Sequence, residues 1–359
     1  MVKKKIVHFI FNLGRGGAET MMVRVIKELN EYEHIIVTIF PLNEFKEEVT
    51  CSKLICFNFK SLFQLPLAVF KFRKVIKDEK PALVHTHLFW PTVIARLAVP
   101  RRIPLLTTIH AFIASSVEYT HWHIRVLDKL TYRFRKSIII VVARGAMEEY
   151  FSFLKIKPYK AYVLYTFVDV ERFNNTAAIQ KIPSDNFRLI SVGALRTQKN
   201  QQYLVEAFAK LKAHPFELHI YGEGDKREAL EKQIQQTGAN VILKGNVSNI
   251  QEIIPQYDLC TMSSTFEGFS LSVLEAMAMG MPLLLSDIKS FKEQCEDTAL
   301  YFSLDNTDDF ILQLKNLSNN KDLLGKVAAA AKERVLNNFT LTHHIKGLRA
   351  IYSDALNTN

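Results

Sequence analysis

Residues 257–287 read YDLCTMSSTFEGFSLSVLEAMAMGMPLLLSD. The apolar run 259–262 ends at two serines, which is typical of a buried strand followed by a loop. Apolar residues then recur at helical spacing from Leu271 until Gly280, and a proline two residues later marks the end of a helix. A second apolar run, 283–285, follows. This order of strand, loop, helix and strand predicts a right-handed parallel crossover.

The loop at 265–270 is where we expect a ligand, because open α/β sheets bind ligands beyond the carboxyl ends of their strands. Gly268 allows the backbone to approach that ligand closely. Glu267 lies at the mouth of the loop, and Glu275 lies about two turns into the helix. The amides that open the helix are expected to bind an anion. They belong to Phe269, Ser270 and Leu271. Carboxylates beside an anion site suit a ligand that carries both phosphate and sugar hydroxyl groups.

The segment Glu267-Gly-Phe-Ser-x-x-x-x-Glu275-Ala-Met, with Ala-x-Gly-x-Pro after it, resembles the signature of a known family. That family is the retaining, nucleotide-sugar-dependent family 4 glycosyltransferases. The resemblance extends over nearly the whole chain and is strongest from about 189 to 287. The alternative is a surface loop before an ordinary amphipathic helix, although a helix that looks buried rarely carries a glutamate for packing reasons.

The resemblance implies the GT-B fold, an α/β architecture of two Rossmann-like parallel-sheet domains that face each other across a cleft. We expect an acceptor-binding domain at 1–170 and a donor-binding domain at 187–339. A linker would span 171–186, and a C-terminal helix at 340–359 would cross back to the first domain.

The resemblance also implies roles for two carboxylates and two cations. Glu267 would orient the transferred sugar and offset positive charge at its anomeric carbon, and Glu275 would accept hydrogen bonds from ribose hydroxyls. Lys199 matches a family lysine that binds the donor diphosphate. Arg196 would replace the family arginine, because the usual position holds Ala194. Solvated loop cations are the alternative for both.

A second loop expected near the nucleotide is Gly245-Asn-Val247-Ser248, which in the family contacts the base. A third is the glycine-rich turn Gly14-Arg-Gly16-Gly17-Ala-Glu19 between a predicted strand and a helix, a position that suits phosphate. It is not a dinucleotide fingerprint, because Glu19 takes the place of the third glycine, which argues against an NAD-dependent oxidoreductase. The resemblance implies that Gly16 and Gly17 lie near the donor diphosphate. A tight turn without a ligand is the alternative.

Histidines follow two predicted strands. His110 ends the strand 105–109, and the resemblance places such a histidine beside the donor sugar and the acceptor, although a packing role is the alternative. His85 and His87 could suggest a metal, but the sequence shows no third ligand nearby. Because two cations can neutralise a leaving diphosphate, we expect a metal-independent reaction with no cofactor besides the nucleotide sugar, carrying UDP or GDP.

The basic charge of the chain is concentrated in its first half. Residues 1–170 hold 26 Lys and Arg against 14 Asp and Glu, a net charge of +12, whereas the remainder has a net charge of −2. Two basic segments with interleaved apolar residues, 60–80 and 121–136, are expected to bind an anionic membrane, and an anionic acceptor is the other choice for 121–136. A crossover helix with a solvated basic face is the alternative for 60–80. No nucleic-acid motif accompanies either segment.

The four cysteines show no metal-type spacing, so we expect free thiols in a reducing compartment. The apolar run near the start is too short for a secretory signal, and no uninterrupted run of about 18 apolar residues occurs. These features predict a cytoplasmic protein that can lie on the inner face of the plasma membrane.

The expected function is therefore a retaining glycosyltransferase that moves a hexose-type sugar from a nucleotide sugar to a lipid-linked or saccharide acceptor in bacterial surface polysaccharide synthesis. A sugar-nucleotide epimerase or hydrolase on the same fold is one alternative. A non-catalytic scaffold that binds nucleotide sugar is another. The base, the sugar and the acceptor stay open.

Overall fold

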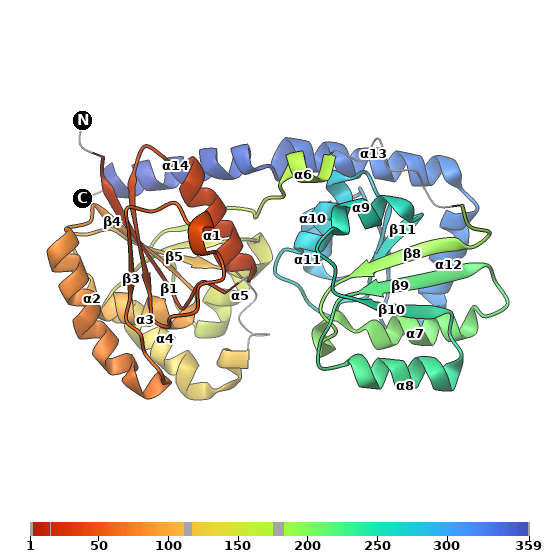
Figure 1. Cartoon of the computed structure of the whole chain (residues 1–359), viewed down its shortest axis with the longest axis horizontal. Helices are drawn as coiled ribbons and strands as arrows, with labels where there is room; N and C mark the ends of the chain where they lie inside the picture. Colours follow the sequence, from red (N-terminus) through yellow and green to blue (C-terminus); the bar gives the residue numbers. More distant parts are fainter. Residues whose placement is uncertain (1–2, 15, 111–116, 175–182, 358–359) are drawn as a thin grey trace. The chain divides into compact units, whose positions relative to one another are not determined.

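The chain forms two compact units, described here from a computed structural model (Figure 1). The first comprises Met1–Thr166 with Thr342–Asn359, and the second comprises Phe167–Leu341. The structure describes residues 3–14, 16–110, 117–174 and 183–357.

The boundary between the units falls earlier than the sequence suggests. We expected the first domain to extend to residue 170 and a linker to follow at 171–186, but helix α6 (Val170–Asn174) belongs to the second unit. It begins there because Val168 pairs with Thr340 in a short parallel bridge within that unit. Residues 175–182 of the expected linker lie outside the described residues.

The first unit is built on a parallel sheet of seven strands in the order β3-β2-β1-β4-β5-β6-β7. The strands are β1 (Lys5–Ile10), β2 (Glu33–Thr38), β3 (Lys53–Cys56), β4 (Leu83–His87), β5 (Leu105–Ile109), β6 (Ile138–Val141) and β7 (Ala161–Val163). In register, Val7 lies beside Ile35 on one side and Val84 on the other. Because β1 adjoins both β2 and β4, the order of strands reverses between β1 and β4, and such a switch point is where α/β sheets bind ligands.

Helices cover both faces of this sheet (Figure 1). They are α1 (Gly17–Glu28), α2 (Leu65–Glu79), α3 (Phe89–Ala98), α4 (Trp122–Phe134), α5 (Arg144–Leu154) and α14 (Leu341–Asn357). Alternate residues of β1 point to opposite faces. Val7 and Phe9 belong to the core shared with α2 and α3, whereas Ile10 packs against α1. Helix α3 lies against α2 on one side and α4 on the other.

The second unit repeats the design with a parallel sheet of six strands in the order β10-β9-β8-β11-β12-β13. The strands are β8 (Phe187–Val192), β9 (Phe216–Tyr221), β10 (Val241–Gly245), β11 (Leu259–Met262), β12 (Leu283–Ser286) and β13 (Leu300–Phe302). The other helices are α7 (Gln201–Lys210), α8 (Arg227–Thr237), α9 (Ile250–Ile253), α10 (Leu271–Ala278), α11 (Lys289–Cys295), α12 (Thr307–Ser318) and α13 (Lys321–Asn338). Its switch point lies between β8 and β11.

The crossover expected within 257–287 is confirmed. Strand β11 spans the expected 259–262, and helix α10 begins at Leu271 and ends at Ala278. Gly280, with φ +68°, follows in the left-handed conformation that glycine adopts without strain.

All four cysteines are free thiols, as expected, and Cys260 and Cys295 are buried. None of the helices in the described residues combines the length and the apolar character needed to cross a bilayer.

Glycines let the loops after β8 and β9 touch. A Cβ on Gly222, which has φ +144°, would lie 2.0 Å from the carbonyl oxygen of Gly193. A Cβ on Gly224 would lie 2.3 Å from the carbonyl oxygen of Leu195. Both contacts involve backbone atoms, which cannot move aside as a flexible side chain can.

We therefore expect Gly222→Ala to lower the free energy of unfolding by about 2–3 kcal/mol, through the clash and the left-handed backbone together. Urea unfolding at constant pH measures this. Gly325→Ala is the matched control, because a Cβ there meets nothing within 4 Å and the residue lies inside α13, where alanine is favoured. Equal stability of the two variants would contradict the close approach.

Candidate functional site

The loops after β8 and β11 meet at the switch point of the second unit. Ser263 Oγ donates hydrogen bonds to the carbonyl oxygens of Lys199 (3.1 Å) and Asn200 (2.9 Å). Thr265 N donates to Gln198 O (2.9 Å), and Gln198 Nε2 donates to a carbonyl on the β11 loop. These bonds join residues more than 60 positions apart and hold the two loops as one surface.

An ion pair between Lys199 and Glu267 lies on this surface. Lys199 Nζ is 2.6 Å from Glu267 Oε1. The same oxygen accepts a bond from Ser264 Oγ (2.7 Å), while Gln198 Nε2 lies 3.4 Å from Oε2. Glu267 is only 6% exposed. Since Lys199 has three N–H donors and only one of them donates to Glu267, its ammonium group can still bind an anion.

Gly193 makes room for Lys199. A Cβ at Gly193 would lie 3.2 Å from Lys199 Cε, closer than most such contacts. Gly193, directly after β8, therefore lies beneath the Lys199 side chain, which reaches Glu267 on the loop after β11. This agrees with the sequence-based expectation that Lys199 and Glu267 lie together.

Glu275 lies in the second turn of α10 and is half-buried. Burial raises the pKa of its carboxyl to about 7, against a smaller opposing effect of Arg172. Burial, and then the charge of Glu275, raises the pKa of the Cys260 thiol on β11. No hydrogen bond to this side chain occurs among the residues that the structure describes. A half-buried carboxyl without a donor is suited to a ligand that brings hydroxyl groups.

One of the three amides expected to bind an anion is already occupied. Ser270 N donates to Gln294 Oε1 (2.9 Å), and Gln294 Nε2 donates back to Ser270 O (2.8 Å). The expectation for Ser270 was therefore wrong, because a side chain from α11 satisfies it. Phe269 is buried against Phe339, with ring centroids 5.1 Å apart. The amide of Leu271, at the first position of α10, has no intrahelical acceptor.

The remaining second-unit residues lie on loops at the same edge of the sheet. Gly268 lies between Glu267 and the start of α10. Arg196 is exposed at the start of a 3₁₀ turn (Thr197–Lys199) and forms no ion pair within the described residues. Val247, 37% exposed, follows β10, whose last residue Gly245 accepts a bond from Gly222 N (2.9 Å). Arg196 and Val247 are thus accessible to a ligand.

In the first unit, Gly16 and Gly17 are exposed at the start of α1. A Cβ on Gly16 would lie 2.4 Å from Glu19 Oε2, so the Glu19 side chain folds back over this turn. Burial raises the pKa of the Glu19 carboxyl. The turn expected to bind phosphate therefore already faces a carboxylate of its own helix, which an incoming phosphate would have to displace.

His110 lies at the carboxyl end of β5, as expected. Its Nε2 is 3.1 Å from Nδ1 of His87, which ends the neighbouring strand β4. Burial, and then His344, lowers the pKa of His110 to about 3. Leu88, the residue after His87, has φ +68°, a strained conformation for a leucine. Near the switch point of the first unit, the strand ends therefore carry neutral imidazoles, whereas those of the second unit carry a charged pair.

The expectation that His85 and His87 lack a third partner was wrong. His8, on β1, lies beside them, and ligand nitrogens of the three lie within 4.8 Å of one another. However, both ring nitrogens of His85 are already hydrogen-bonded, Nδ1 to Tyr352 Oη (2.8 Å) and Nε2 to Thr108 Oγ1 (2.7 Å). It could hold a metal only by giving up one of these bonds.

His8 has a free lone pair. His34 Nε2 must donate to the carbonyl oxygen of Leu29 (2.8 Å), so its Nδ1 accepts from His8 Nε2 (3.0 Å). Burial lowers the pKa values of both imidazoles, which keeps His8 neutral with Nδ1 unprotonated. That atom and Nε2 of His87 are buried without a partner among the described residues. They face a small cavity of about 20 Å³, large enough for one water molecule.

Three residues of the second-unit site were missed in the sequence. Ser264 had a signal, since it follows a buried strand directly and such positions line ligand sites. Gln198 lies between two cations that were recognised, but nothing local marks it. Gln294 lies in another helix, and its role depends on a contact 24 residues away.

Two family models match the chain in succession. "Glycosyltransferase Family 4" matches residues 15–172, and "Glycosyl transferases group 1" matches residues 173–334. The chain belongs to the family 4 glycosyltransferases. The recognition made from Glu267-Gly-Phe-Ser and Glu275 is thereby confirmed.

Named relatives of this family 4 glycosyltransferase span most of its length. A Campylobacter jejuni enzyme, N-acetylgalactosamine-N,N'-diacetylbacillosaminyl-diphospho-undecaprenol 4-alpha-N-acetylgalactosaminyltransferase, is 25% identical over 92% of this chain and 94% of its own. An Escherichia coli enzyme, UDP-Gal:alpha-D-GlcNAc-diphosphoundecaprenol alpha-1,3-galactosyltransferase, is 26% identical over 78% of this chain and 77% of its own. The chain is thus similar to glycosyltransferases over both units.

Solved structures agree on the fold of the glycosyltransferase. Anabaena Alr3699/HepE, crystallised with UDP, superposes with a TM-score of 0.84 at 18% identity, covering 98% of this chain and all of the other. Sucrose-phosphate synthase from Thermosynechococcus elongatus gives a TM-score of 0.85 at 16% identity, covering 99% and 100%. The expected α/β fold of GT-B type, with two Rossmann-like parallel-sheet domains, is confirmed.

Proposed function

We propose that this glycosyltransferase transfers a hexose-type sugar from a nucleotide sugar to a lipid-linked or saccharide acceptor, with retention of the anomeric configuration, in surface polysaccharide synthesis. The observation that carries the proposal is the Lys199–Glu267 ion pair at the switch point of the second unit. A cation and a carboxylate fixed 2.6 Å apart can serve a leaving diphosphate and a reacting sugar at the same time.

The departing diphosphate carries the charge that must be stabilised. Lys199 has two donors beyond the one spent on Glu267, and the exposed Arg196 offers a planar fork that matches phosphate oxygens. The amide of Leu271 adds a donor at the start of α10. These groups neutralise the leaving nucleotide without a metal ion, which is why we propose metal-independent transfer.

Glu267 acts on the sugar. The bonds from Ser264 and Lys199 fix its carboxylate, so it can orient hydroxyl groups and offset positive charge that develops at the anomeric carbon. We do not assign it as a covalent nucleophile, since delivery of the acceptor on the face of the leaving group retains configuration without one. In the first unit, neutral His110 orients the donor sugar or the acceptor hydroxyl.

The relatives support the class of donor and acceptor. Both relatives described above are named for acceptors on undecaprenol diphosphate, and the E. coli enzyme is named for UDP-Gal. A structural neighbour was crystallised with UDP-glucose. We therefore propose a UDP-sugar donor, with GDP-sugar as the other choice, and an undecaprenyl-diphosphate-linked acceptor.

Lys199→Ala and Glu267→Gln should each lower the rate of transfer about a hundredfold, since loss of one contact to the transition state costs about 3 kcal/mol. A screen of nucleotide sugars, by thermal stabilisation and slow donor hydrolysis, first finds the donor. Lys210→Ala is the matched control, because it breaks an exposed ion pair with Asp308 in the same unit.

Near-normal transfer by either variant would remove its residue from the mechanism. Melting curves must accompany the rates, because Lys199→Ala leaves the buried Glu267 without its cation. If products contain an altered or hydrolysed donor but no glycoside with any acceptor, the epimerase or hydrolase alternative holds instead.

Glu275 should make UDP binding depend on pH. Its carboxyl has a pKa of about 7 without ligand, and hydrogen bonds from ribose hydroxyls favour the charged form and lower that pKa. Binding then releases a proton, so the affinity should rise up to about tenfold per pH unit from pH 6 to 7 and level off by pH 8. Calorimetry of UDP measures this. Glu275→Gln should bind more weakly and retain only the pH dependence of the phosphate itself; equal profiles would exclude the role of Glu275.

A second proposal concerns the membrane. Helix α4 exposes Trp122, Val126, Leu130 and Phe134, which are four residues apart and 42–70% exposed. Phe63, in a 3₁₀ turn just before α2, and Leu67 and Phe70, in the first turns of α2, are 55–94% exposed. Lysines and arginines accompany both sets within 60–80 and 121–136. Since α2 and α4 flank α3 on one face of the sheet, we propose that this face binds an anionic membrane.

Trp122→Ser/Leu130→Ser should weaken binding to phosphatidylglycerol vesicles at least tenfold, because each inserted side chain contributes about 1–2 kcal/mol. Co-sedimentation at two salt concentrations measures this, and high salt should weaken wild-type binding. Leu312→Ser is the control, as Leu312 is 56% exposed like Leu130 but lies in the second unit. Equal binding by all three proteins would count against this face.

A further inference from the structure

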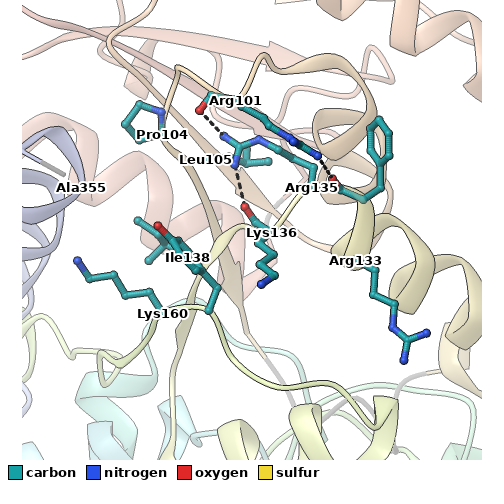
Figure 2. A pocket seen from close by; sticks show the side chains of 11 residues that line it. Arg101, Pro104, Leu105, Arg133, Arg135, Lys136, Ile138, Lys160 and Ala355 are labelled. Atoms are coloured by element: carbon teal, nitrogen blue, oxygen red, sulfur yellow. Dashed lines mark hydrogen bonds between the residues drawn. The ribbon is translucent and has the colours of Figure 1, made fainter. Parts of the chain in front are cut away.

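A cavity of about 360 Å³ opens on the first unit, beside the end of the basic segment 121–136 (Figure 2). It lies where β5 and β6 begin, between the end of α4, the start of β6 and the last turn of α14. Five of its lining side chains are basic and none is acidic. They are Arg101, Arg133, Arg135, Lys136 and Lys160.

Four of these cations have no acidic partner in the part of the chain that the structure describes. Only Lys160 forms an ion pair, with Asp354. Arg101, Arg133, Arg135 and Lys136 form none within the described residues. Elsewhere in the same unit, burial of an arginine is matched by a carboxylate: Arg96 is fully buried and pairs with Asp128. Of these four, Arg135 is half-buried and the other three are exposed. Like charges gathered around one cavity repel each other, and an anion from outside the chain offsets that repulsion.

Backbone carbonyls hold Arg135 in place (Figure 2). Its Nη2 donates to Ile103 O (2.7 Å), and its Nη1 donates to Lys136 O (2.9 Å). Arg101 Nη2 in turn donates to Phe134 O (3.3 Å). Nε of Arg135 is buried without a partner among the described residues. Burial, and then Arg101, lowers the pKa of Arg135. The guanidinium is therefore positioned by the fold, and its neighbours repel it.

The cavity is separate from the proposed donor and acceptor residues. His110 and Gly16 lie beyond the carboxyl ends of their strands, whereas Leu105 and Ile138, which line the cavity, are the first residues of β5 and β6. The two edges of the sheet are about 15 Å apart, because β5 contains five residues. An anion bound here would not react.

We propose that this cavity binds a phosphomonoester or diphosphate group. Arginine forks match the oxygens of phosphate, and Lys136 adds a charge beside the ring of Tyr159, with its Nζ 5.9 Å from the ring centroid. The volume exceeds that of a single phosphate, so a diphosphate or a headgroup fits. Leu130 and Phe134 are exposed on the last turns of α4, next to the mouth, which offers an apolar neighbour to a lipid-borne phosphate.

The test compares two variants that each lose two positive charges. Arg133→Gln/Lys136→Gln removes exposed cavity cations that make no backbone anchor, so the fold should survive. Lys4→Gln/Lys27→Gln removes two exposed lysines elsewhere in the unit. Inorganic pyrophosphate is titrated by calorimetry into wild type and both variants, and vesicles with and without phosphatidic acid are then tested by co-sedimentation. The comparison between variants isolates the cavity even where pyrophosphate also binds the proposed donor site.

We expect the cavity variant to bind pyrophosphate about tenfold more weakly than the control variant. Because Arg133 and Lys136 also lie in 121–136, the phosphatidylglycerol vesicles used above serve as a reference of like charge. A loss of binding to phosphatidic acid vesicles that exceeds the loss on phosphatidylglycerol vesicles assigns the phosphate to a lipid headgroup, and an equal or smaller loss assigns it to a soluble phosphate. Identical pyrophosphate isotherms for the two variants would overturn the proposal, whatever the outcome for transfer activity. Because Lys199 and Glu267 are intact in every protein, failure here leaves the proposed transfer untouched.

Discussion

The Lys199–Glu267 ion pair is the interaction on which the proposed transfer depends. It is buried enough that neither charge can be left alone, yet it leaves lysine donors free. The loops that carry it come from β8 and β11, neighbours that the chain visits about 70 residues apart, and Ser263 and Gln198 fasten them together. The site is therefore a consequence of strand order: another order would separate the two charges.

The same topology occurs twice, but the two switch points differ in chemistry. In the second unit the strand ends carry a charged pair. In the first unit they carry His87 and His110, whose pKa values burial lowers, so that the imidazoles are neutral. A neutral imidazole can accept or donate a hydrogen bond at no cost in charge, which suits hydroxyl groups, while the charged pair suits a diphosphate. In the proposed transfer, the two copies of one architecture would therefore divide the tasks: the charged pair would serve the nucleotide sugar and the imidazoles the alcohol acceptor.

Much of the fold, and part of the site, could be predicted from the sequence because the signals are local. The helix at 271–278 and the strand at 259–262 follow from apolar spacing and from Gly280, and the family motif brought Lys199 and Glu267 to attention. What escaped prediction depends on contacts between distant segments. Gln294 reaches Ser270 from another helix, and His8 approaches His85 only because β1 and β4 are neighbours in the sheet. No periodicity within a short window encodes such pairs.

The uneven charge of the chain acquires a more specific meaning once it is placed on the fold. Residues 51–136 hold 15 basic and 4 acidic residues, and a solvated basic face would explain such a composition equally well. A solvated face, however, would need neither an exposed apolar residue at every fourth position of α4 nor five cations around one cavity, of which only Lys160 pairs with a carboxylate among the described residues. Net charge alone attracts any polyanion at long range. The proposed membrane contact rests on the apolar residues of α4, which suit a surface that accepts insertion. The proposed phosphate site rests on guanidinium groups fixed by backbone carbonyls, whose planar forks match phosphate oxygens. In both proposals the geometry of the charges, more than their number, selects the partner.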